Sequence, residues 1–142
     1  MIEIKNGKVA PARVAERLVK NVRLARYALS LNGAMYVFAL QPSLFTTAKQ
    51  LTKREQEELR SKSKPYFVAC TRAIDARLSA LDLEGFAYVN LCDVFDTGYD
   101  NEELFIDNYH VADKGTLVIA ERLARELRGL LRPERRREGS AP

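Results

Sequence analysis

An aspartate and a histidine three residues apart are the side chains of this sequence best suited to acid–base chemistry. His110 is the only histidine among the 142 residues, and Asp107 precedes it in the run Leu104–His110. An imidazole titrates near neutral pH, so it can accept a proton and return it during catalysis. A carboxylate bonded to Nδ1 fixes the tautomer of the ring and stabilises the imidazolium that forms. The pair therefore has the chemistry of two members of a Ser-His-Asp triad.

The same two residues also have an interpretation without catalysis. Asp-x-x-His is a short pattern that arises often by chance, and the aspartate could cap a loop that carries a surface histidine. Local chemistry leaves both interpretations open. The setting adds weight to the catalytic one, because an apolar approach, a tight loop and a following helix can hold a general base rigidly.

Two apolar runs predict the strands of a buried parallel sheet. Ala34–Leu40 is continuously apolar and is followed by Gln41-Pro42, and Phe86–Leu91 follows Gly85. Strands that are buried on both faces show such runs without alternation. Sites in open α/β sheets form beyond the carboxyl ends of the strands. Gln41 is therefore a candidate substrate-binding residue near the Asp107–His110 loop.

Helical periodicity describes most of the remaining chain. An apolar face with basic residues opposite predicts a helix between residues 11 and 33, and Thr52–Glu55 matches a capping box. A third helical pattern restarts at Pro65, and a last helix begins near Asp113. The last helix is expected to bury Leu117, Ala120, Ala124, Leu127 and Leu131. This order predicts a three-layer α/β sandwich with a short parallel sheet, formed by residues 1–131 as one domain.

Composition and charge narrow the function classes. Hydrophobic residues make up 46% and charged residues 30% of the chain, which is typical of one globular domain. Four arginines lie in residues 132–142, a segment predicted to be a basic disordered tail, and the remaining chain is close to neutral. The pI of about 9.2 therefore does not argue for nucleic acid as a partner.

The spacing of the cysteines, the length of the apolar runs and the N-terminal residues argue against a metal-binding, a membrane-spanning or a secreted protein. Cys70 and Cys92 have no metal-binding spacing and are predicted to be buried free thiols, although a disulfide stays open. No apolar run is long enough to cross a bilayer, and Met1–Lys5 does not look like a signal peptide. As written, the sequence predicts a cytoplasmic chain with no membrane partner.

The run Leu104–Gly115, followed by Ile119–Leu123, resembles the last conserved block of the SGNH (GDSL-type) hydrolases. That block consists of Asp-x-x-His, a short loop with a glycine, and a C-terminal helix. The strand ending in Leu40-Gln41-Pro42 and the later Leu91–Phe95 are also similar to members of this superfamily. The similarity covers about Val22–Leu127, which is well short of a whole family domain.

This resemblance implies a flavodoxin-like domain and acyl-ester hydrolysis by a Ser-His-Asp triad, without metal or cofactor. Asp107 would orient the base, and His110 would take the proton of a serine and pass it to the leaving group. The family also needs a Gly-Asp-Ser motif, a later glycine and the Asn of Gly-x-Asn-Asp, which form the oxyanion hole. This chain contains neither a Gly-Asp-Ser nor a Gly-x-Asn-Asp sequence. The resemblance therefore implies the C-terminal half of such a hydrolase, nearly inactive alone, whose parent enzyme takes a small ester.

Other residues could be considered as the missing nucleophile. Ser43 and Cys92 each follow a predicted strand, but Ser43 has no glycine elbow, and the two are better interpreted as a turn hydroxyl and a core thiol. The rival class of function is a non-catalytic α/β interaction module that keeps the fold without the chemistry.

The predicted sheet also has consequences for assembly. Met35–Leu40 is apolar on both faces, as in a central strand, yet few partner strands are available. Residues Met1–Lys8 could add a strand, or a missing N-terminal half could complete the sheet. Otherwise we expect two copies to pair, so that the chain forms a homo-oligomer, most simply a dimer.

Overall fold

A computed structural model describes residues 4–5, 8–59 and 64–131, and the predicted tail at 132–142 lies outside the described residues. The described elements, in chain order, are β1 (Ile4–Lys5), β2 (Lys8–Val9), α1 (Pro11–Ser30), β3 (Tyr36–Leu40), α2 (Lys53–Glu58), α3 (Lys64–Ser79), β4 (Phe86–Asn90) and α4 (Asp113–Leu131). The predicted order of helices and strands is confirmed, with a short N-terminal hairpin in addition.

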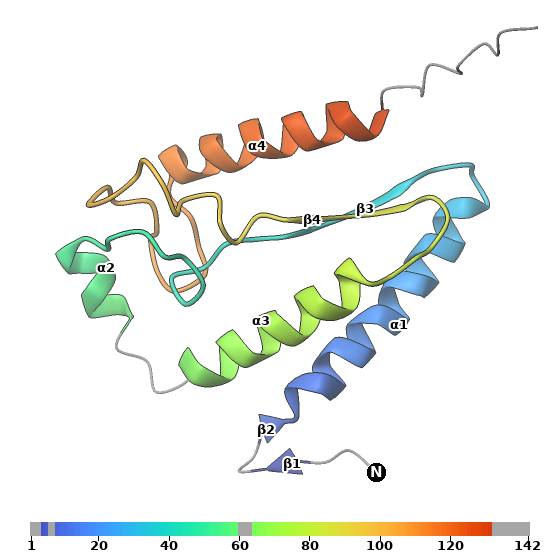
Figure 1. Cartoon of the computed structure of the whole chain (residues 1–142), viewed down its shortest axis with the longest axis horizontal. Coiled ribbons are helices and arrows are strands. Elements are labelled where there is room, and N and C mark those ends of the chain that lie inside the picture. Colours follow the sequence, from blue (N-terminus) through green and yellow to red (C-terminus); the bar gives the residue numbers. More distant parts are fainter. Residues whose placement is uncertain (1–3, 6–7, 60–63, 132–142) are drawn as a thin grey trace, which may run out of the picture.

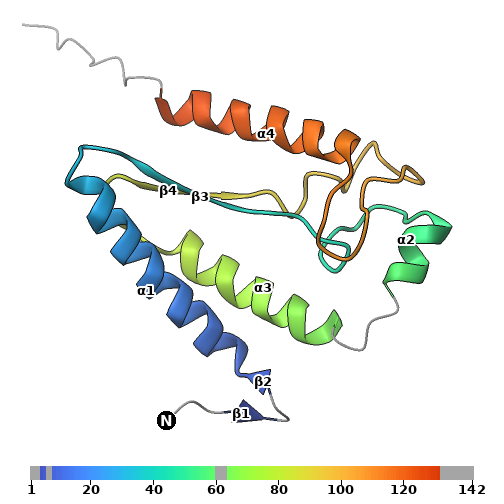
Figure 2. The same ribbon diagram turned by 180° about the vertical axis from the view of Figure 1, so that it is seen from behind.

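The centre of the fold is a parallel pair of strands between two layers of helices. β3 and β4 pair in register from Tyr36 opposite Phe86 to Leu40 opposite Asn90. Helix α4 lies along one face of the pair, and α1 and α3 lie on the other (Figures 1 and 2). The described residues thus form a mixed α/β fold with a short parallel sheet, as the sequence predicted.

The N-terminal hairpin does not extend the parallel sheet. β1 and β2 pair with each other in antiparallel fashion, with Ile4 opposite Val9. The Tyr66 hydroxyl of α3 donates a hydrogen bond to the Val9 carbonyl at 2.9 Å, which holds the hairpin against the helical layer. The expectation that this segment could add a strand beside β3 is therefore not met.

The first helix follows the sequence pattern closely. Proline at its first position has a backbone angle already suited to a helix, and α1 buries Ala15 and Val22 against its surroundings. Gly33 adopts a φ of 66°, the left-handed conformation that ends the helical region at low steric cost. α1 packs chiefly against α3, and its basic face is exposed as predicted.

The prediction for the last helix is partly wrong. Leu117 and Leu131 are 62% and 71% exposed, and Ala120 is also exposed, whereas Ala124 and Leu127 are half-buried. The physical reason is the width of the sheet: two strands cannot cover the whole apolar face of a five-turn helix. Only the first half of α4 meets the loop core.

The two largest fully buried side chains, Phe95 and Phe105, lie beneath the loops at the carboxyl end of the strands, and Ala15, Val22 and Leu78 are as well buried in the α1–α3 layer. Leu44, Phe95, Leu104 and Phe105 are at most 1% exposed and form one cluster. The rings of Phe95 and Phe105 meet edge to face, with centroids 5.3 Å apart. The segments that carry the candidate site therefore surround an apolar core of their own.

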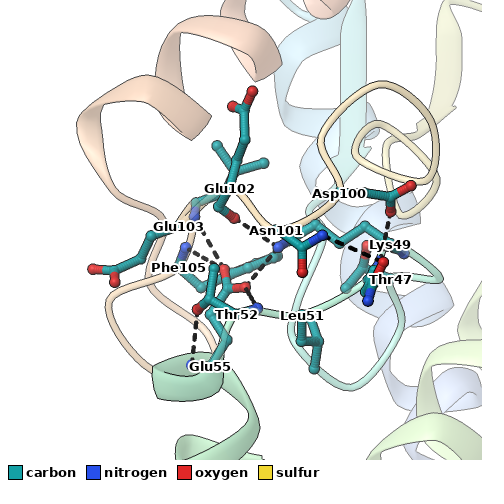
Figure 3. Close-up of polar contacts among 12 residues, drawn as sticks. Thr47, Lys49, Leu51, Thr52, Glu55, Asp100, Asn101, Glu102, Glu103 and Phe105 are labelled. Atoms are coloured by element: carbon teal, nitrogen blue, oxygen red, sulfur yellow. Dashed lines mark hydrogen bonds and ion pairs between the residues drawn. The ribbon is translucent and has the colours of Figure 1, made fainter.

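A buried ion pair joins these segments. The Lys49 Nζ lies 2.6 Å from Glu55 Oε2, and their side chains are 0% and 1% exposed (Figure 3). The lysine donates a further hydrogen bond of 2.8 Å to the Glu102 carbonyl. The second oxygen of Glu55 accepts the backbone N–H groups of Leu104 and Phe105 at 3.0 and 3.2 Å. A single carboxylate therefore binds two loops that are about fifty residues apart in sequence.

Glu55 also completes the capping box predicted at the start of α2. Its backbone N–H donates to the Thr52 hydroxyl at 3.2 Å, and its carboxylate accepts the Thr52 N–H at 3.0 Å. Burial by itself raises the pKa of Glu55. The hydrogen bonds from Lys49, Leu104 and Thr52 outweigh burial and hold this pKa below its usual value. The carboxylate is therefore ionised at neutral pH.

We predict that Glu55→Gln destabilises the chain by about 3–5 kcal/mol, because it leaves the Lys49 charge buried without a counter-ion. The lowered pKa of Glu55 means that its stabilising contribution is complete above the ordinary carboxyl pKa and is lost as the pH falls further. Chemical denaturation over a range of pH measures both effects.

The matched control is Arg54→Ala, which breaks the exposed ion pair with Glu103 on the same two segments. It should cost about 1 kcal/mol or less. Equal losses for the two variants would show that the buried pair does not hold the loops together.

Candidate active site

The Asp107 carboxylate and the His110 imidazole form the pair that the sequence predicted. His110 Nδ1 lies 2.7 Å from Asp107 Oδ2. The other carboxylate oxygen, Oδ1, accepts the backbone N–H groups of Tyr109 and His110, each at 2.8 Å. Because both oxygens are engaged, the carboxylate has a defined orientation and directs one oxygen at the imidazole.

The loop that carries the pair is a short hairpin. Phe105 and Val111 form an antiparallel bridge, and the Ile106 N–H donates to the His110 carbonyl at 2.8 Å. The Ala112 N–H donates to the Leu104 carbonyl, also at 2.8 Å. The base of the hairpin therefore starts at the two residues that Glu55 binds.

Two contacts tie the tip of the hairpin to the segment that follows β3. The Leu44 N–H donates to the Asn108 carbonyl at 3.1 Å. The Gln41 side-chain amide donates to the Tyr109 carbonyl at 3.2 Å. Gln41 therefore lies beside the hairpin at the carboxyl end of β3, where it was expected, and supports the loop. A direct contact between Gln41 and a substrate stays a prediction.

An aromatic cluster beneath the loop was not predicted from the sequence. The ring of Tyr109 meets Phe45 and Phe67 edge to face, with centroid distances of 5.4 and 5.2 Å. Phe45 and Phe67 stack on each other at 5.2 Å. These three rings come from the loop after β3, from α3 and from the hairpin. They fix the backbone next to His110 against two other elements.

The two side chains of the pair differ in their exposure to solvent. The side chain of His110 is 76% exposed and that of Asp107 is 43% exposed. The backbone N–H of Tyr109, the His110 ring and the His110 N–H all donate to Asp107 and lower its pKa to about 2. The ionised carboxylate favours the tautomer with the proton on Nδ1. In that tautomer the lone pair of Nε2 is free to accept a proton.

Neither alternative nucleophile is activated by the histidine. The Ser43 hydroxyl lies 3.2 Å from the Thr46 hydroxyl, in a turn. The Cys92 thiol donates to the Gln41 carbonyl at 3.6 Å. Burial, with the nearby aspartates, raises the pKa of the Cys92 thiol above its usual value, so the thiol is protonated at neutral pH. The prediction of a turn hydroxyl at Ser43 agrees with this geometry, whereas the prediction of a buried core thiol at Cys92 is met only in part, because that side chain is half-buried.

The structure settles the state of the cysteines. Cys70 and Cys92 are both free, with Cys70 buried and Cys92 half-buried. The open possibility of a disulfide is therefore excluded. Among the residues that the structure describes, no group of three His, Cys, Asp or Glu side chains could hold a metal ion. In the same residues, no helix is both long enough and apolar enough to span a bilayer.

Comparisons with known proteins return no match to this chain, whether with protein-family models, with curated proteins or with solved structures.

We predict that the Asp107 carboxyl of the folded chain titrates with a pKa of about 2, well below the ordinary value of 3.8. Because its pKa in the folded chain, about 2, lies below the ordinary value of 3.8, the carboxylate stabilises the loop at neutral pH. This contribution decreases as the pH falls from the ordinary value towards the lowered one. The carboxyl ¹³C shift of Asp107 in an NMR titration measures the pKa.

In His110→Gln the side-chain donor changes while the two backbone donors remain, so the pKa of Asp107 should rise but stay below 3.8. An Asp107 carboxyl that titrates at its ordinary value in the parent chain would refute the proposed geometry.

Gly115 sets how closely α4 approaches the hairpin. A Cβ atom at this position would lie 2.9 Å from the Leu104 carbonyl oxygen and would collide with Val111. We predict that Gly115→Ala destabilises the chain by about 1–3 kcal/mol, because the helix has to move away from the base of the loop. Thermal or chemical denaturation measures this change.

Gly129 offers a matched control on the same helix, since a Cβ atom there would meet nothing within 4 Å. Gly129→Ala should stabilise the chain by about 0.5–1 kcal/mol through helix propensity. If both variants were stabilising, the close contact at Gly115 would not exist in solution.

Proposed function

We propose that this chain supplies the general base and its orienting carboxylate for acyl-ester hydrolysis, as the C-terminal part of an SGNH-type hydrolase domain with a flavodoxin-like sheet. The observation that carries the proposal is the His110 Nδ1–Asp107 Oδ2 distance of 2.7 Å, on a carboxylate that two backbone N–H groups hold in place. The exposed imidazole then presents Nε2 to an incoming group.

The proposed chemistry follows from this geometry. Nε2 of His110 takes the proton of an attacking hydroxyl as the oxygen bonds to the ester carbonyl carbon. Asp107 accepts a hydrogen bond from Nδ1–H and stabilises the imidazolium during this step. When the tetrahedral intermediate collapses, the imidazolium returns the proton to the leaving alkoxide. Residues of this hairpin thus control the proton on Nδ1 and the proton that Nε2 accepts and returns.

The nucleophile and the oxyanion hole are the parts that the proposal assigns to another segment. Ser43 and Cys92 are engaged with Thr46 and Gln41 respectively, and neither hydroxyl nor thiol is bonded to the imidazole in the described residues. Oxyanion stabilisation is usually a large term in ester hydrolysis. We therefore expect the chain by itself to act only as a general base towards water, far below the rate of an esterase.

The second candidate is a non-catalytic interaction module. It is favoured by the high exposure of His110 and by the aromatic cluster beneath Tyr109, which could serve the stability of a surface loop alone. In that case Asp107 has a structural role, and the tautomer of His110 has no consequence for chemistry.

The variant Asp107→Asn separates the two candidates. Oδ1 of residue 107 accepts two backbone N–H groups, so the amide oxygen of an asparagine is held at that position. Its NH₂ group must then face Nδ1, which forces the ring proton onto Nε2 and removes the free lone pair. The loop keeps its hydrogen bonds while the base is lost.

We predict that the parent chain accelerates p-nitrophenyl acetate hydrolysis weakly, by no more than the roughly 10²–10⁴-fold of general base catalysis. Asp107→Asn should reduce the His110-dependent part of this rate at least tenfold, with His110→Gln as the baseline. Two-bond ¹H–¹⁵N NMR of the single histidine should show Nδ1–H in the parent and Nε2–H in Asp107→Asn.

Equal rates and equal tautomers in the parent and in Asp107→Asn would favour the interaction module. Ser43→Ala and Cys92→Ala serve as controls and should leave the rate unchanged. Esterase-like turnover that is lost in one of these two variants would show that this chain carries its own nucleophile.

A further inference from the structure

The outer edge of β3 is open in the described residues. The Tyr36 N–H donates to the Gly85 carbonyl, and the Leu40 carbonyl accepts the Leu91 N–H, each at 2.9 Å. Residues in a parallel ladder direct their N–H and C=O groups alternately to the two sides. Val37 and Ala39 therefore point two N–H and two C=O groups away from β4, and the ladder uses none of them.

This edge has none of the usual protection against pairing. Natural edge strands commonly carry charged residues, prolines or bulges. Tyr36–Leu40 has no charged residue and no proline, and Met35 just before it is 41% exposed. The N-terminal hairpin, which could have covered the edge, pairs with itself.

The outer edge of β4 differs from that of β3. Its first outward donor, the Phe86 N–H, is already bonded to the Leu83 carbonyl at 3.0 Å. Acidic residues flank the strand at Glu84 and Asp93, and like charges that approach each other across a strand pair are unfavourable. The open and uncharged edge is therefore that of β3.

We propose that two copies of this chain pair through β3 in antiparallel fashion, about a two-fold axis at Phe38. In this register Val37 exchanges both of its hydrogen bonds with the partner's Ala39, and Ala39 does the same with the partner's Val37. The four groups that each chain leaves open are all satisfied. A second copy fits because the β3 edge is complementary to itself. The two-fold contact uses the β3 edges of both chains, so no β3 edge is left open for a third copy.

The side chains agree with this register. Phe38 opposes the partner's Phe38 in a pair without direct hydrogen bonds, the arrangement in which facing side chains approach most closely. Phe38 already contacts Tyr88 across β3–β4, with ring centroids 6.4 Å apart, so the dimer continues an aromatic row across the sheet. Because the strand carries no charge, no like charges meet across the axis.

The helical layers give a second reason to expect association. α1, which leads into β3, leaves Leu24 and Tyr27 each at 68% exposure, and Leu31 directly after the helix is 72% exposed. On the other layer Leu117 of α4 is 62% exposed. The dimer has a four-stranded sheet, which is a usual size for globular proteins. The helices of two chains cover this sheet, twice as many as cover the narrow β3–β4 pair.

This assembly concerns the chain by itself and adds no residue to the proposed hydrolytic site. The hairpin of His110 lies at the carboxyl end of β3, beside Gln41. Antiparallel pairing places the two hairpins at opposite ends of the joined sheet. The dimer therefore brings no residue of the second copy to His110, and either proposal can fail without the other.

The test uses the whole chain at micromolar concentration. Light scattering should give twice the chain mass of 16.1 kDa. Ala39→Pro removes one outward N–H without touching the β3–β4 ladder, so it should give a monomer with an unchanged far-UV circular dichroism spectrum. A monomeric parent chain, or an assembly larger than a dimer, would overturn the proposal.

Disulfide trapping tests the register and does not depend on Ala39→Pro folding. With Cys70 and Cys92 replaced by serine, Phe38→Cys should crosslink to its copy under mild oxidation, because residues facing each other at the axis meet disulfide geometry. Val37→Cys is the matched control, since its copy lies diagonally across the axis, about 7–8 Å away, and should not crosslink. Equal crosslinking of the two variants, or crosslinking of Val37→Cys alone, would overturn the register and with it the proposed interface.

Discussion

The buried ion pair between Lys49 and Glu55 is the interaction on which the candidate site depends. A charge inside a protein is tolerated only when it is paired and its remaining hydrogen-bonding capacity is used. Here one carboxylate meets the lysine, the start of α2 and two backbone N–H groups of the loop that leads to the hairpin. Because loss of any partner leaves a buried polar group unsatisfied, these segments hold one another in a single arrangement. Further contacts along the same two segments, such as the hydrogen bond from the Gln50 N–H to the Asp100 carboxylate at 2.7 Å, support it.

This ion pair also restricts the position of the His110 imidazole, through the backbone that connects the two. The loop residues that Glu55 binds form the base of the hairpin, and Phe105 bridges Val111 just beyond His110. Asp107 then orients His110 through contacts within four residues, so the pair itself is a local structure. Its place in the molecule is a tertiary matter, decided by the ion pair, by the rings around Tyr109 and by the closeness of α4 at Gly115. A general base needs both local and tertiary contacts, because the local contacts fix its tautomer and the tertiary contacts fix the direction in which the ring points.

The narrow sheet explains most of what departs from the sequence pattern. β3 has the composition of a strand with neighbours on both sides, yet it pairs only with β4 among the described residues. The helices show the same mismatch. Their apolar faces are wider than the sheet beneath them, so Leu31 and Leu131 are exposed at the far ends of α1 and α4. The largest buried side chains instead gather under the loops. A fully buried apolar cluster thus lies beside the candidate site, while the surplus apolar surface lies along the sheet edge and the helices.

The sequence by itself determined the order of the helices and strands, the capping box at Thr52–Glu55 and the Asp107–His110 pair. These features rest on contacts between near neighbours, which spacing and residue type reveal. It did not reveal that Lys49 and Glu55 are buried, because a highly charged segment ordinarily faces water, nor that Phe45 and Phe67 meet Tyr109. Those contacts join residues far apart in the chain, and no local period encodes them. Which apolar faces are covered was likewise decided only by the tertiary structure, because burial depends on the width of the sheet that two strands can form.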